Sequence, residues 1–380
     1  MTTETFDIIV IGAGIAGASV AAELSRTHRV AILEREEFPG YHSTGRSAAL
    51  FSEIYGNSVV RALSRASRNF FYAPPRGFAA NPLVKPRGSL HIANEKQLPH
   101  LERFAQNADL AGSIRHLTRE EALRACPVLR ADYVSAALIE DDAADVDVNE
   151  LHQGYLRQFR AVGGKVFVNA DVKALSPNGS QWIAETGVGT FAANIVVNAA
   201  GAWADAVARK AGVAPLNIQP RRRTALLAEL PAGISAETWP MVIDIDESFY
   251  LKPDAGLLLI SPADETPVTA CDVQPEEFDI AVAIDRVEQA TTLNITRIRK
   301  RWAGLRSFAP DRSPVIGFDS AVPGFFWLAA QGGYGIQTAP AAARLAAALL
   351  RGETPSDLEV SIPALSPERF AQRSATRSHA

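Results

Sequence analysis

Three glycines near the start of the chain have the spacing of a dinucleotide-binding turn. Gly12, Gly14 and Gly17 form a G-x-G-x-x-G pattern between an apolar run and an alanine-rich run. Gly12 permits the turn, Gly14 lets the backbone approach a pyrophosphate, and Gly17 lets a helix pack close to a sheet. Glu34 ends the next apolar run, where a carboxylate can accept hydrogen bonds from ribose hydroxyls. The pattern therefore predicts a strand, a tight turn, a helix and a second strand around a dinucleotide.

A second glycine-rich turn lies near the other end of the chain. Residues 331–338 read Gln-Gly-Gly-Tyr-Gly-Ile-Gln-Thr, between an apolar run at 324–330 and an Ala/Leu-rich run at 339–350. This repeats the order strand, glycines, helix, so a helix N-terminus could face an electron-rich ring and stabilise its reduced, anionic form. A simple tight turn before a helix is the alternative interpretation.

Two further segments could reach the same ligand. The polar loop after the second strand contains Ser43, Thr44 and Arg46, whose side chains can donate hydrogen bonds to phosphate. An apolar strand at 194–200 runs into Gly201 and a helix start, where the backbone could approach the ligand again. For the polar loop, an ordinary surface loop is the alternative.

The elements that would position these residues follow from periodicity and turn residues. From Gln219 onward, short apolar runs joined by polar turns predict a mostly antiparallel sheet. The clustered carboxylates at 141–147 lack the glycine and the final glutamate of a calcium loop, so they predict a helix N-cap rather than a metal site. Helices are expected at 57–72, 95–107, 118–124, 148–162, 279–293 and 339–350.

The composition is that of an ordinary globular enzyme. The 380 residues are 47% apolar and 21% charged, and the net charge of −4 provides no overall basic surface for nucleic acid. Cys126 and Cys271 lack the spacing of a metal site and predict free thiols in a reducing compartment. The N-terminal residues lack the positive charge of a signal peptide, and the apolar runs are too short to span a membrane. We therefore expect a cytoplasmic protein with no membrane span, no nucleic-acid partner and no metal.

In combination these motifs resemble those of the FAD-dependent D-amino acid oxidase and glycine oxidase superfamily. The two glycine turns are joined by Ser-Thr-Gly-Arg-Ser at 43–47, by Val-Val-Asn-Ala-Ala-Gly-Ala-Trp at 196–203 and by Trp-x-Gly-x-Arg at 302–306. The resemblance covers nearly the whole chain. The segments most similar to the bacterial D-arginine dehydrogenases of this superfamily are 39–46, 151–157, 246–256 and 329–338.

The resemblance implies an α/β fold with a Rossmann-like FAD-binding domain of the glutathione-reductase type. A second, α+β domain with a mostly antiparallel sheet would bind the substrate. The FAD domain would comprise 1–85, 145–218 and 302–380, and the substrate domain 86–144 and 219–301. FAD would be held non-covalently. Its expected contacts are Gly12, Gly14, Ile15, Ala16, Gly17, Glu34, Arg35, Ser43, Thr44, Arg46, Ser47, Ala48, Ala49, Val172, Ala200, Gly201, Trp203, Gly304, Arg306, Gly332, Gly333, Tyr334, Gly335, Ile336, Gln337 and Thr338.

The implied reaction is the oxidation of a D-amino acid to an imino acid, which water hydrolyses to a 2-oxo acid and ammonia. Hydride passes from Cα to flavin N5, so positioning the substrate is the main task of the protein. By resemblance, Arg223 and Arg306 would clamp the substrate carboxylate, and Tyr55 and Tyr250 would donate hydroxyls to it. An arginine in an apolar strand also fits a structural ion pair. The electron acceptor would be quinone-type or oxygen.

Departures from the arginine-specific relatives bear on the substrate. Those relatives carry a glutamate at the position of Ser89 and a histidine at that of Leu50, so the partner for a cationic tail is missing here. Glu53 or Asp244 could restore a cation site, with surface exposure as the alternative. We therefore expect a dehydrogenase that prefers neutral or hydrophobic D-amino acids. The expected pocket residues are Ala48, Leu50, Ser52, Glu53, Ser89, Met241, Ile243 and Gly333.

Two other functions fit the same residues. Paired arginines call for a carboxylate but not for an α-amine, so a flavoenzyme of this fold acting on a secondary amine or a 2-hydroxy acid is one alternative. A non-catalytic dinucleotide-binding protein is the other, and the complete set of Tyr55, Arg223, Tyr250 and Arg306 argues against it.

Overall fold

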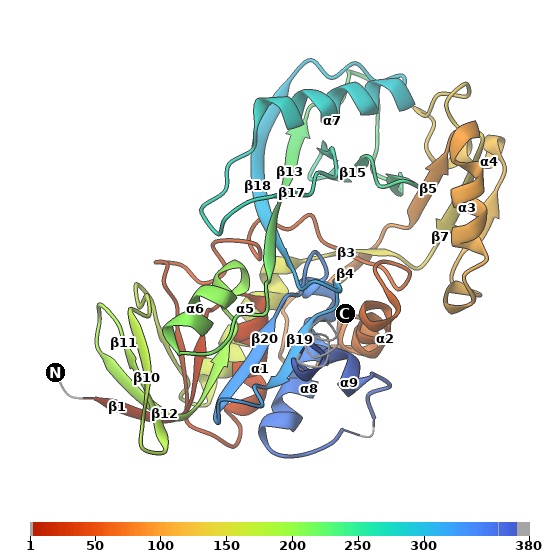
Figure 1. Cartoon of the computed structure of the whole chain (residues 1–380). Coiled ribbons are helices and arrows are strands. Elements are labelled where there is room, and N and C mark those ends of the chain that lie inside the picture. Colours follow the sequence, from red (N-terminus) through yellow and green to blue (C-terminus); the bar gives the residue numbers. More distant parts are fainter. Residues whose placement is uncertain (1–2, 356, 371–380) are drawn as a thin grey trace, which may run out of the picture.

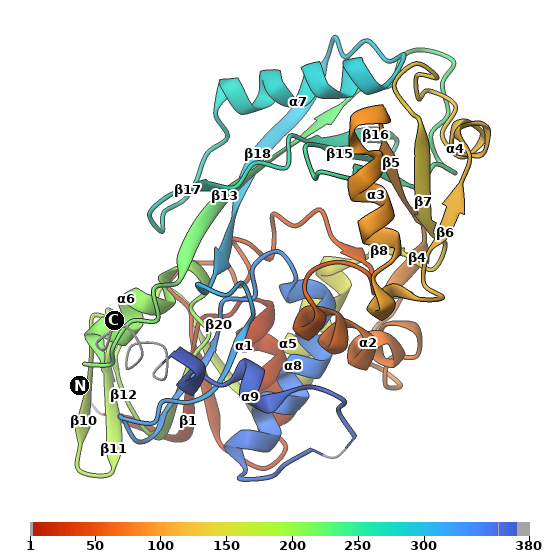
Figure 2. The same cartoon turned by 45° about the vertical axis from the view of Figure 1, so that its right-hand side comes forward.

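The computed structural model describes residues 3–355 and 357–370, in which the chain forms two large β-sheets and a small one (Figures 1 and 2). Within these residues the first sheet has eight strands, the second nine and the third three. The first sheet runs in the order β10-β11-β12-β1-β2-β9, and β20 joins it beside β12 and carries β19. Its strands are β1 (Glu4–Ile11), β2 (Val30–Leu33), β9 (Lys165–Phe167), β10 (Ala174–Asn178), β11 (Gln181–Glu185), β12 (Thr190–Asn198), β19 (Val315–Phe318) and β20 (Phe325–Ala329).

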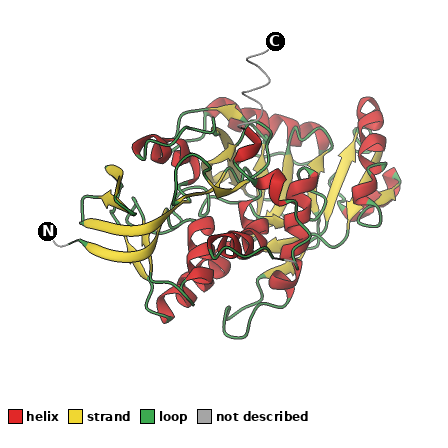
Figure 3. Cartoon of the chain, turned by 60° about the horizontal axis from the view of Figure 1, so that its bottom comes forward, coloured by secondary structure: helices red, strands yellow, loops and turns green. Residues whose placement is uncertain are grey.

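Alternating side chains of β1 explain why this first sheet is covered on both faces. Ile8 and Val10 belong to one apolar core, while Ile9 and Ile11 belong to another on the opposite face, and all four are buried. Parallel pairing of β1 with β2 requires a crossover connection, which α1 provides. Figure 3 shows helices packed beside the strands. The first core is lined by α1 (Ile15–Leu24), α5 (Val148–Ala161) and α8 (Gly335–Leu350), and the second by α6 (Ala204–Lys210).

The second sheet is antiparallel except where β14 pairs with β5. Its longest pair joins β13 to β18, and α7 (Glu277–Ala290), at the top of Figure 1, contacts β13 and β16. Helices α3 (Leu98–Ala105) and α4 (Arg119–Ala125) both contact β7 but belong to different apolar cores, with α4 in the core that also contains α7. The strands are β5 (Ser89–Ala93), β6 (Arg115–Leu117), β7 (Ala136–Glu140), β13 (Gln219–Ala228), β14 (Met241–Asp244), β15 (Tyr250–Asp254), β16 (Leu257–Ser261), β17 (Thr266–Pro267) and β18 (Ile298–Phe308).

The third sheet lies between the other two and pairs β3 (Leu50–Phe51) and β4 (Val84–Pro86) with β8 (Ala144–Val146). Helix α2 (Ser58–Tyr72) follows β3 and packs against α8. A short α9 (Ile362–Leu365) contacts β19.

Several helix ends agree with their sequence signals. Asp147 caps α5 by accepting a hydrogen bond from the backbone N–H of Glu150, as expected of the acidic turn. The same helix stops before Gly163, which has a φ of 88°. The last long helix was predicted to begin at residue 339 but begins at Gly335, so the second glycine turn runs directly into its first turn.

Three expected domain boundaries do not coincide with the end of an element, and two of them, 85/86 and 144/145, fall inside β4 and β8. The boundary at 301/302 falls inside β18, which pairs with β13 from its first residues to its last. Since β18 belongs wholly to the second sheet, the return of the chain to the first sheet comes after Phe308.

Candidate active site

A single cavity of about 390 Å³ runs from the β1–α1 turn, along the first sheet, to the inner face of the second sheet. This volume lies in the range of roughly 300–1,000 Å³ that is typical of ligand pockets. The expected cofactor residues that line it are Gly12, Gly14, Ile15, Ala16, Glu34, Arg35, Ser43, Thr44, Arg46, Ser47, Ala48, Ala49, Val172, Ala200, Gly201, Trp203, Gly304, Arg306, Gly332, Gly333, Gly335, Ile336 and Gln337.

The β1–α1 turn has the geometry that the glycine pattern predicted. Gly12 has a φ of 101°, and a Cβ there would lie 2.6 Å from the carbonyl oxygen of Ala199. A Cβ on Gly17 would lie 1.9 Å from the oxygen of Gly12, so α1 crosses the turn at a distance only glycine allows. Gly14 provides α1 with no side-chain cap, and the first turn of the helix carries no acidic residue. This N-terminus is therefore suited to an anion such as a phosphate.

Glu34 lies beside this turn at the end of β2. It is buried, and its carboxylate accepts hydrogen bonds from the backbone N–H of Ala13 at 2.7 Å and of Glu36 at 2.9 Å. These bonds hold the carboxylate at the cavity wall, where further lone pairs remain for a ribose. The residues around the turn therefore fit a dinucleotide such as FAD.

Three expected cofactor residues lie behind the cavity wall. Gly17 makes the close helix crossing described above, and the Thr338 hydroxyl donates to the carbonyl oxygen of Tyr334 within α8. Tyr334 is buried against Tyr55 and Phe308. These three residues are not among those that line the cavity.

The polar loop expected to donate to phosphate instead ties the two large sheets together. Ser43 donates to the carbonyl oxygen of Leu305 in β18, and Thr44 accepts from the backbone N–H of Ile15. The Arg46 guanidinium donates to the carbonyl oxygens of Val273 and Ala303 and pairs with Asp272. The loop lines the cavity, but the guanidinium of Arg46 is committed to the protein.

Four of the expected catalytic side chains meet at the end of the cavity beneath the second sheet. Arg306 in β18 donates to the Tyr55 hydroxyl at 2.7 Å and to Glu265 at 2.8 Å, and Arg223 in β13 donates to the Asp264 carbonyl oxygen. The Arg223 guanidinium carbon lies 6.0 Å from the centre of the Tyr250 ring. Tyr55, Arg223, Tyr250 and Arg306 all line the cavity.

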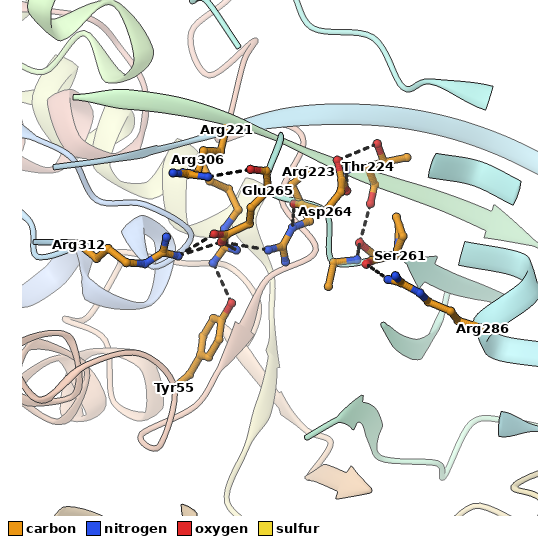
Figure 4. A network of polar contacts seen from close by, with 12 residues as sticks. Tyr55, Arg221, Arg223, Thr224, Ser261, Asp264, Glu265, Arg286, Arg306 and Arg312 are labelled. Carbon is orange, nitrogen blue, oxygen red and sulfur yellow. Dashed lines mark hydrogen bonds and ion pairs between the residues drawn. The ribbon is translucent and has the colours of Figure 1, made fainter. Parts of the chain in front are cut away.

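Glu265 lies behind these arginines and was not predicted. Its carboxylate pairs with Arg223, Arg306 and Arg312, and its backbone oxygen accepts from Arg221 (Figure 4). Arg223 and Arg306 thus make the structural ion pairs considered as an alternative, yet they also face the cavity. One carboxylate against three guanidinium groups leaves a net positive charge for an anionic ligand.

Arg306 keeps its charge although its side chain is almost fully buried. Burial by itself lowers the pKa of Arg306, but the neighbouring Tyr55, Tyr334 and Glu265 raise it, and the net pKa is above the ordinary value. A Cβ on Gly333 would lie 2.0 Å from Nη2 of Arg306, so the guanidinium packs against a bare backbone. The site therefore presents a fixed cation to the cavity.

The pocket residues predicted from resemblance divide into two groups. Glu53 is turned away and pairs with Arg68 at 2.8 Å, while Ser89 is fully buried with its hydroxyl donating to Glu140, and neither residue is among those that line the cavity. Asp244, offered as a cation site, is buried and accepts from Gln97 and Tyr133. The expected pocket residues that do line the cavity are Ala48, Leu50, Ser52, Met241, Ile243 and Gly333.

His91 and Glu247 line the same end of the cavity and were missed. Burial lowers the pKa of His91 to about 4, so its ring is neutral near pH 7. Glu247 is exposed at the cavity rim, three residues after the buried Asp244. Its place in the segment 246–256, already singled out by resemblance, was the available signal.

Two general expectations concern the residues that the structure describes. Among them, no group of His, Cys, Asp or Glu side chains is arranged to hold a metal ion. No helix formed by these residues is long and apolar enough to cross a membrane.

Similarity to known proteins agrees with this geometry. The chain is 26% identical to glycine oxidase of Geobacillus kaustophilus over 377 residues, which cover 94% of this chain and 96% of that protein. The fold matches L-proline dehydrogenase from P. horikoshii with a TM-score of 0.84 and 25% identity, over 98% and 99% of the two chains. It also matches FAD-bound L-α-glycerophosphate oxidase from Mycoplasma pneumoniae with a TM-score of 0.82 and 19% identity, over 94% and 99%.

A family profile settles the assignment of the chain. The profile described as FAD dependent oxidoreductase, DAO, matches residues 7–349, which include both glycine turns, the polar loop and all four side chains at the far end of the cavity. Because this match extends over most of the sequence, the chain belongs to the DAO family of FAD-dependent oxidoreductases.

Proposed function

We propose that this enzyme oxidises a D-amino acid with a neutral or hydrophobic side chain to the imino acid, which water hydrolyses to a 2-oxo acid and ammonia. The observation that carries the proposal is the convergence of Arg223, Arg306, Tyr55 and Tyr250 on one end of the FAD cavity. Two guanidinium groups and two hydroxyls in one wall match the donors that a carboxylate accepts. Relatives named glycine oxidase and L-proline dehydrogenase support an amino acid as substrate.

The arginines would fix the substrate by its carboxylate. Arg306 is held on one side by Glu265 and on the other by the Tyr55 hydroxyl, so its guanidinium cannot swing away from the cavity. A planar fork held in this way can bind a carboxylate through two parallel hydrogen bonds. Fixing the carboxylate restricts the position of Cα, which is the main requirement for hydride transfer.

The side chain of the substrate would lie against an apolar wall. Leu50, Met241 and Ile243 line the cavity next to the clamp, and none of them carries a charge. Glu53 and Asp244, the carboxylates that could have paired with a cationic tail, are engaged elsewhere in the fold. These contacts favour neutral and hydrophobic side chains.

The chemistry needs little else from the protein. When bound, FAD supplies the two-electron acceptor for the hydride leaving Cα. At this end of the cavity His91 is neutral and the arginines are positively charged. These charges favour a substrate whose α-amine has already lost its proton. The second proton leaves the amine as the imine forms and passes to solvent. Non-covalent FAD and reoxidation by a quinone-type acceptor rather than oxygen complete the proposal.

A substrate screen under anaerobic conditions tests this function. Holoenzyme is mixed with each member of a panel of D- and L-amino acids, and loss of the oxidised flavin absorbance is followed. We expect bleaching by neutral D-amino acids, slow recovery when oxygen is admitted, and rapid recovery with a quinone. Selective bleaching by L-amino acids, or by D-Arg and D-Lys, would contradict the substrate assignment. Acid precipitation that releases all the flavin would support non-covalent binding.

A secondary amine is the second candidate substrate. Similarity to L-proline dehydrogenase at a TM-score of 0.84 favours it, and a further relative is the rat dimethylglycine dehydrogenase, 24% identical over 98% of this chain. The arginine clamp fits N-alkyl amino acids and 2-hydroxy acids equally well, since both carry a carboxylate. Including sarcosine, proline and 2-hydroxy acids in the same screen separates these candidates.

A further inference from the structure

Glu140 is a buried carboxylate next to the cavity. It is 2% exposed and accepts hydrogen bonds from Ser52 Oγ at 2.7 Å, from the backbone N–H of Glu53 at 2.8 Å and from Ser89 Oγ at 3.1 Å. Among residues 3–355 and 357–370, no lysine or arginine forms an ion pair with it. A buried charge without a counterion is costly, and such groups concentrate at functional sites.

The three hydrogen bonds determine what the neighbouring side chains offer to the cavity. A serine hydroxyl has one proton, and Ser52 gives its proton to Glu140, so Ser52 Oγ can only accept from a ligand. Ser89 Oγ lies 3.1 Å from the Glu140 carboxylate and 3.4 Å from His91 Nε2. Its proton goes to the closer, anionic group. Nε2 of His91 must then carry the proton and donate to Ser89, which leaves Nδ1 as the acceptor of a neutral ring.

These acceptors lie on the wall of the same cavity as the arginines. Ser52 and His91 line the cavity, whereas Glu140 and Ser89 lie behind them. In the second sheet His91 faces Ile243 across one strand pair, and Ile243 faces Tyr250 across the next. Directly paired residues share a face of the sheet, and two strand spacings amount to roughly 10 Å. A substrate held by its carboxylate near Tyr250 would therefore extend its side chain past Ile243 toward His91.

We propose that Ser52 and His91 form a subsite that accepts a hydrogen bond from the far end of the substrate side chain, with Glu140 as the positioning residue behind them. The inference rests on the proposed function, because the arginine clamp sets where the carboxylate lies. It narrows the substrate class to amino acids with a long, largely apolar side chain that ends in a donor such as a phenol. Leu50, Met241 and Ile243 contact the apolar part of that side chain, and Ser52 and His91 contact its donor.

Matched substrates that differ by one hydroxyl test the subsite. For the wild-type holoenzyme we expect kcat/KM for D-tyrosine to exceed that for D-phenylalanine by at least tenfold. Glu140→Gln keeps the shape of the side chain, but its amide can donate to Ser52 or Ser89 and so reverses their hydrogen bonds. The ratio should fall at least tenfold through a higher KM for D-tyrosine.

Asp142→Asn is the matched control. Asp142 is an exposed carboxylate two residues from Glu140 and pairs with Arg68, so its loss should leave the D-tyrosine preference unchanged. If Glu140→Gln fails to fold or to bind FAD, Ser52→Ala removes one acceptor from the wall and should reduce the same ratio. Equal kcat/KM for the two substrates in the wild type, or a wild-type ratio in both variants, would overturn the inference.

The screen also separates this inference from the proposed function. If no D-amino acid bleaches the flavin, the function fails, and the subsite is then tested by binding of 3-(4-hydroxyphenyl)propionate against 3-phenylpropionate, followed by the flavin spectrum. Tighter binding of the hydroxylated acid supports the subsite, and equal binding contradicts it. A preference for D-lysine over both aromatic substrates would support Ser52 and His91 as hydrogen-bond acceptors. It would contradict the proposed function, which calls for a neutral substrate side chain.

Discussion

The three arginines that pair with Glu265 have different roles, which follow from where their side chains lie. Arg223 and Arg306 line the cavity, whereas Arg312 reaches the same carboxylate from the solvent side, with 46% of its side chain exposed. The carboxylate of Glu265 holds all three guanidinium groups in one cluster. Only those that face the cavity can contact a substrate.

Arg306→Lys should impair the use of carboxylate substrates while the charge is kept. Lysine presents a single ammonium group in place of the planar fork and cannot bind Glu265, Tyr55 and a substrate carboxylate together. We expect kcat/KM to fall about 100-fold, which corresponds to about 2.7 kcal/mol of transition-state stabilisation, chiefly through a higher KM. Steady-state kinetics with the best substrate of the screen measures this change.

Arg312→Lys serves as the comparison for that variant. It changes the same kind of side chain against the same Glu265 carboxylate but outside the cavity, so kcat/KM should stay within about threefold of wild type. Equal losses in the two variants would show that the cluster supports the fold rather than the substrate.

The sequence predicted the residues that face the ligand better than the residues that surround them. Tyr55, Arg223, Tyr250 and Arg306 were expected together, and the structure brings them to one cavity end. Glu265 was missed because it reaches Arg306 only through the fold, from 41 residues away in the chain. Ser89 was expected in the pocket by resemblance and Glu53 from its place two residues before Tyr55, but Ser89 hydrogen-bonds to Glu140 and Glu53 pairs with Arg68.

Among the elements, the crossing of α1 over the β1–α1 turn depends on a single missing side chain. A Cβ on Gly17 would lie 1.9 Å from the Gly12 oxygen and 3.2 Å from Val10 Cγ1. Gly17→Ala must therefore push α1 away from β1. Overpacking of this kind costs about 1–3 kcal/mol, and the displaced helix N-terminus should bind FAD at least tenfold more weakly. Urea unfolding and titration of the stripped protein with FAD measure the two effects.

Gly187→Ala provides the reference substitution. A Cβ at Gly187 would have no heavy atom closer than 3.8 Å, so the variant should match the wild type in both measurements. If Gly17→Ala behaved in the same way, the close crossing would not be needed for FAD binding.

The elements that were predicted well are those whose signals are local. The first glycine turn, the Asp147 cap and the end of α5 before Gly163 each depend on residues a few positions apart. The start of α8 was misplaced because glycines usually interrupt a helix, whereas here Gly335 opens one under a packed tyrosine. Strands β17 and β19 were missed because both are short and take their stability from pairing with β13 and β20.

For the whole molecule, the cavity lies where the two large sheets are tied to each other. Ser43 donates to Leu305, the Trp302 indole donates to the Arg46 carbonyl oxygen, and the Arg46 guanidinium donates to Ala303. Each bond joins the polar loop that follows β2 to β18 of the second sheet. Cofactor binding and the docking of the sheets should therefore be linked.

Arg46→Met tests this linkage. The variant removes the bonds to Val273, Ala303 and Asp272 but keeps a flexible apolar side chain of similar length. A ligand at 100 times its Kd stabilises the folded state by about 2.7 kcal/mol, so FAD should raise the Tm of the stripped wild type by several degrees. If these bonds hold the loop against the cofactor, the same FAD concentration should raise the Tm of Arg46→Met by less than that of the wild type. Tryptophan fluorescence during heating measures both.

Arg344→Met, which breaks a surface ion pair with Asp357, is the control and should show the same increase in Tm as the wild type. An equal increase in all three proteins would show that FAD binding does not depend on the contact between the sheets.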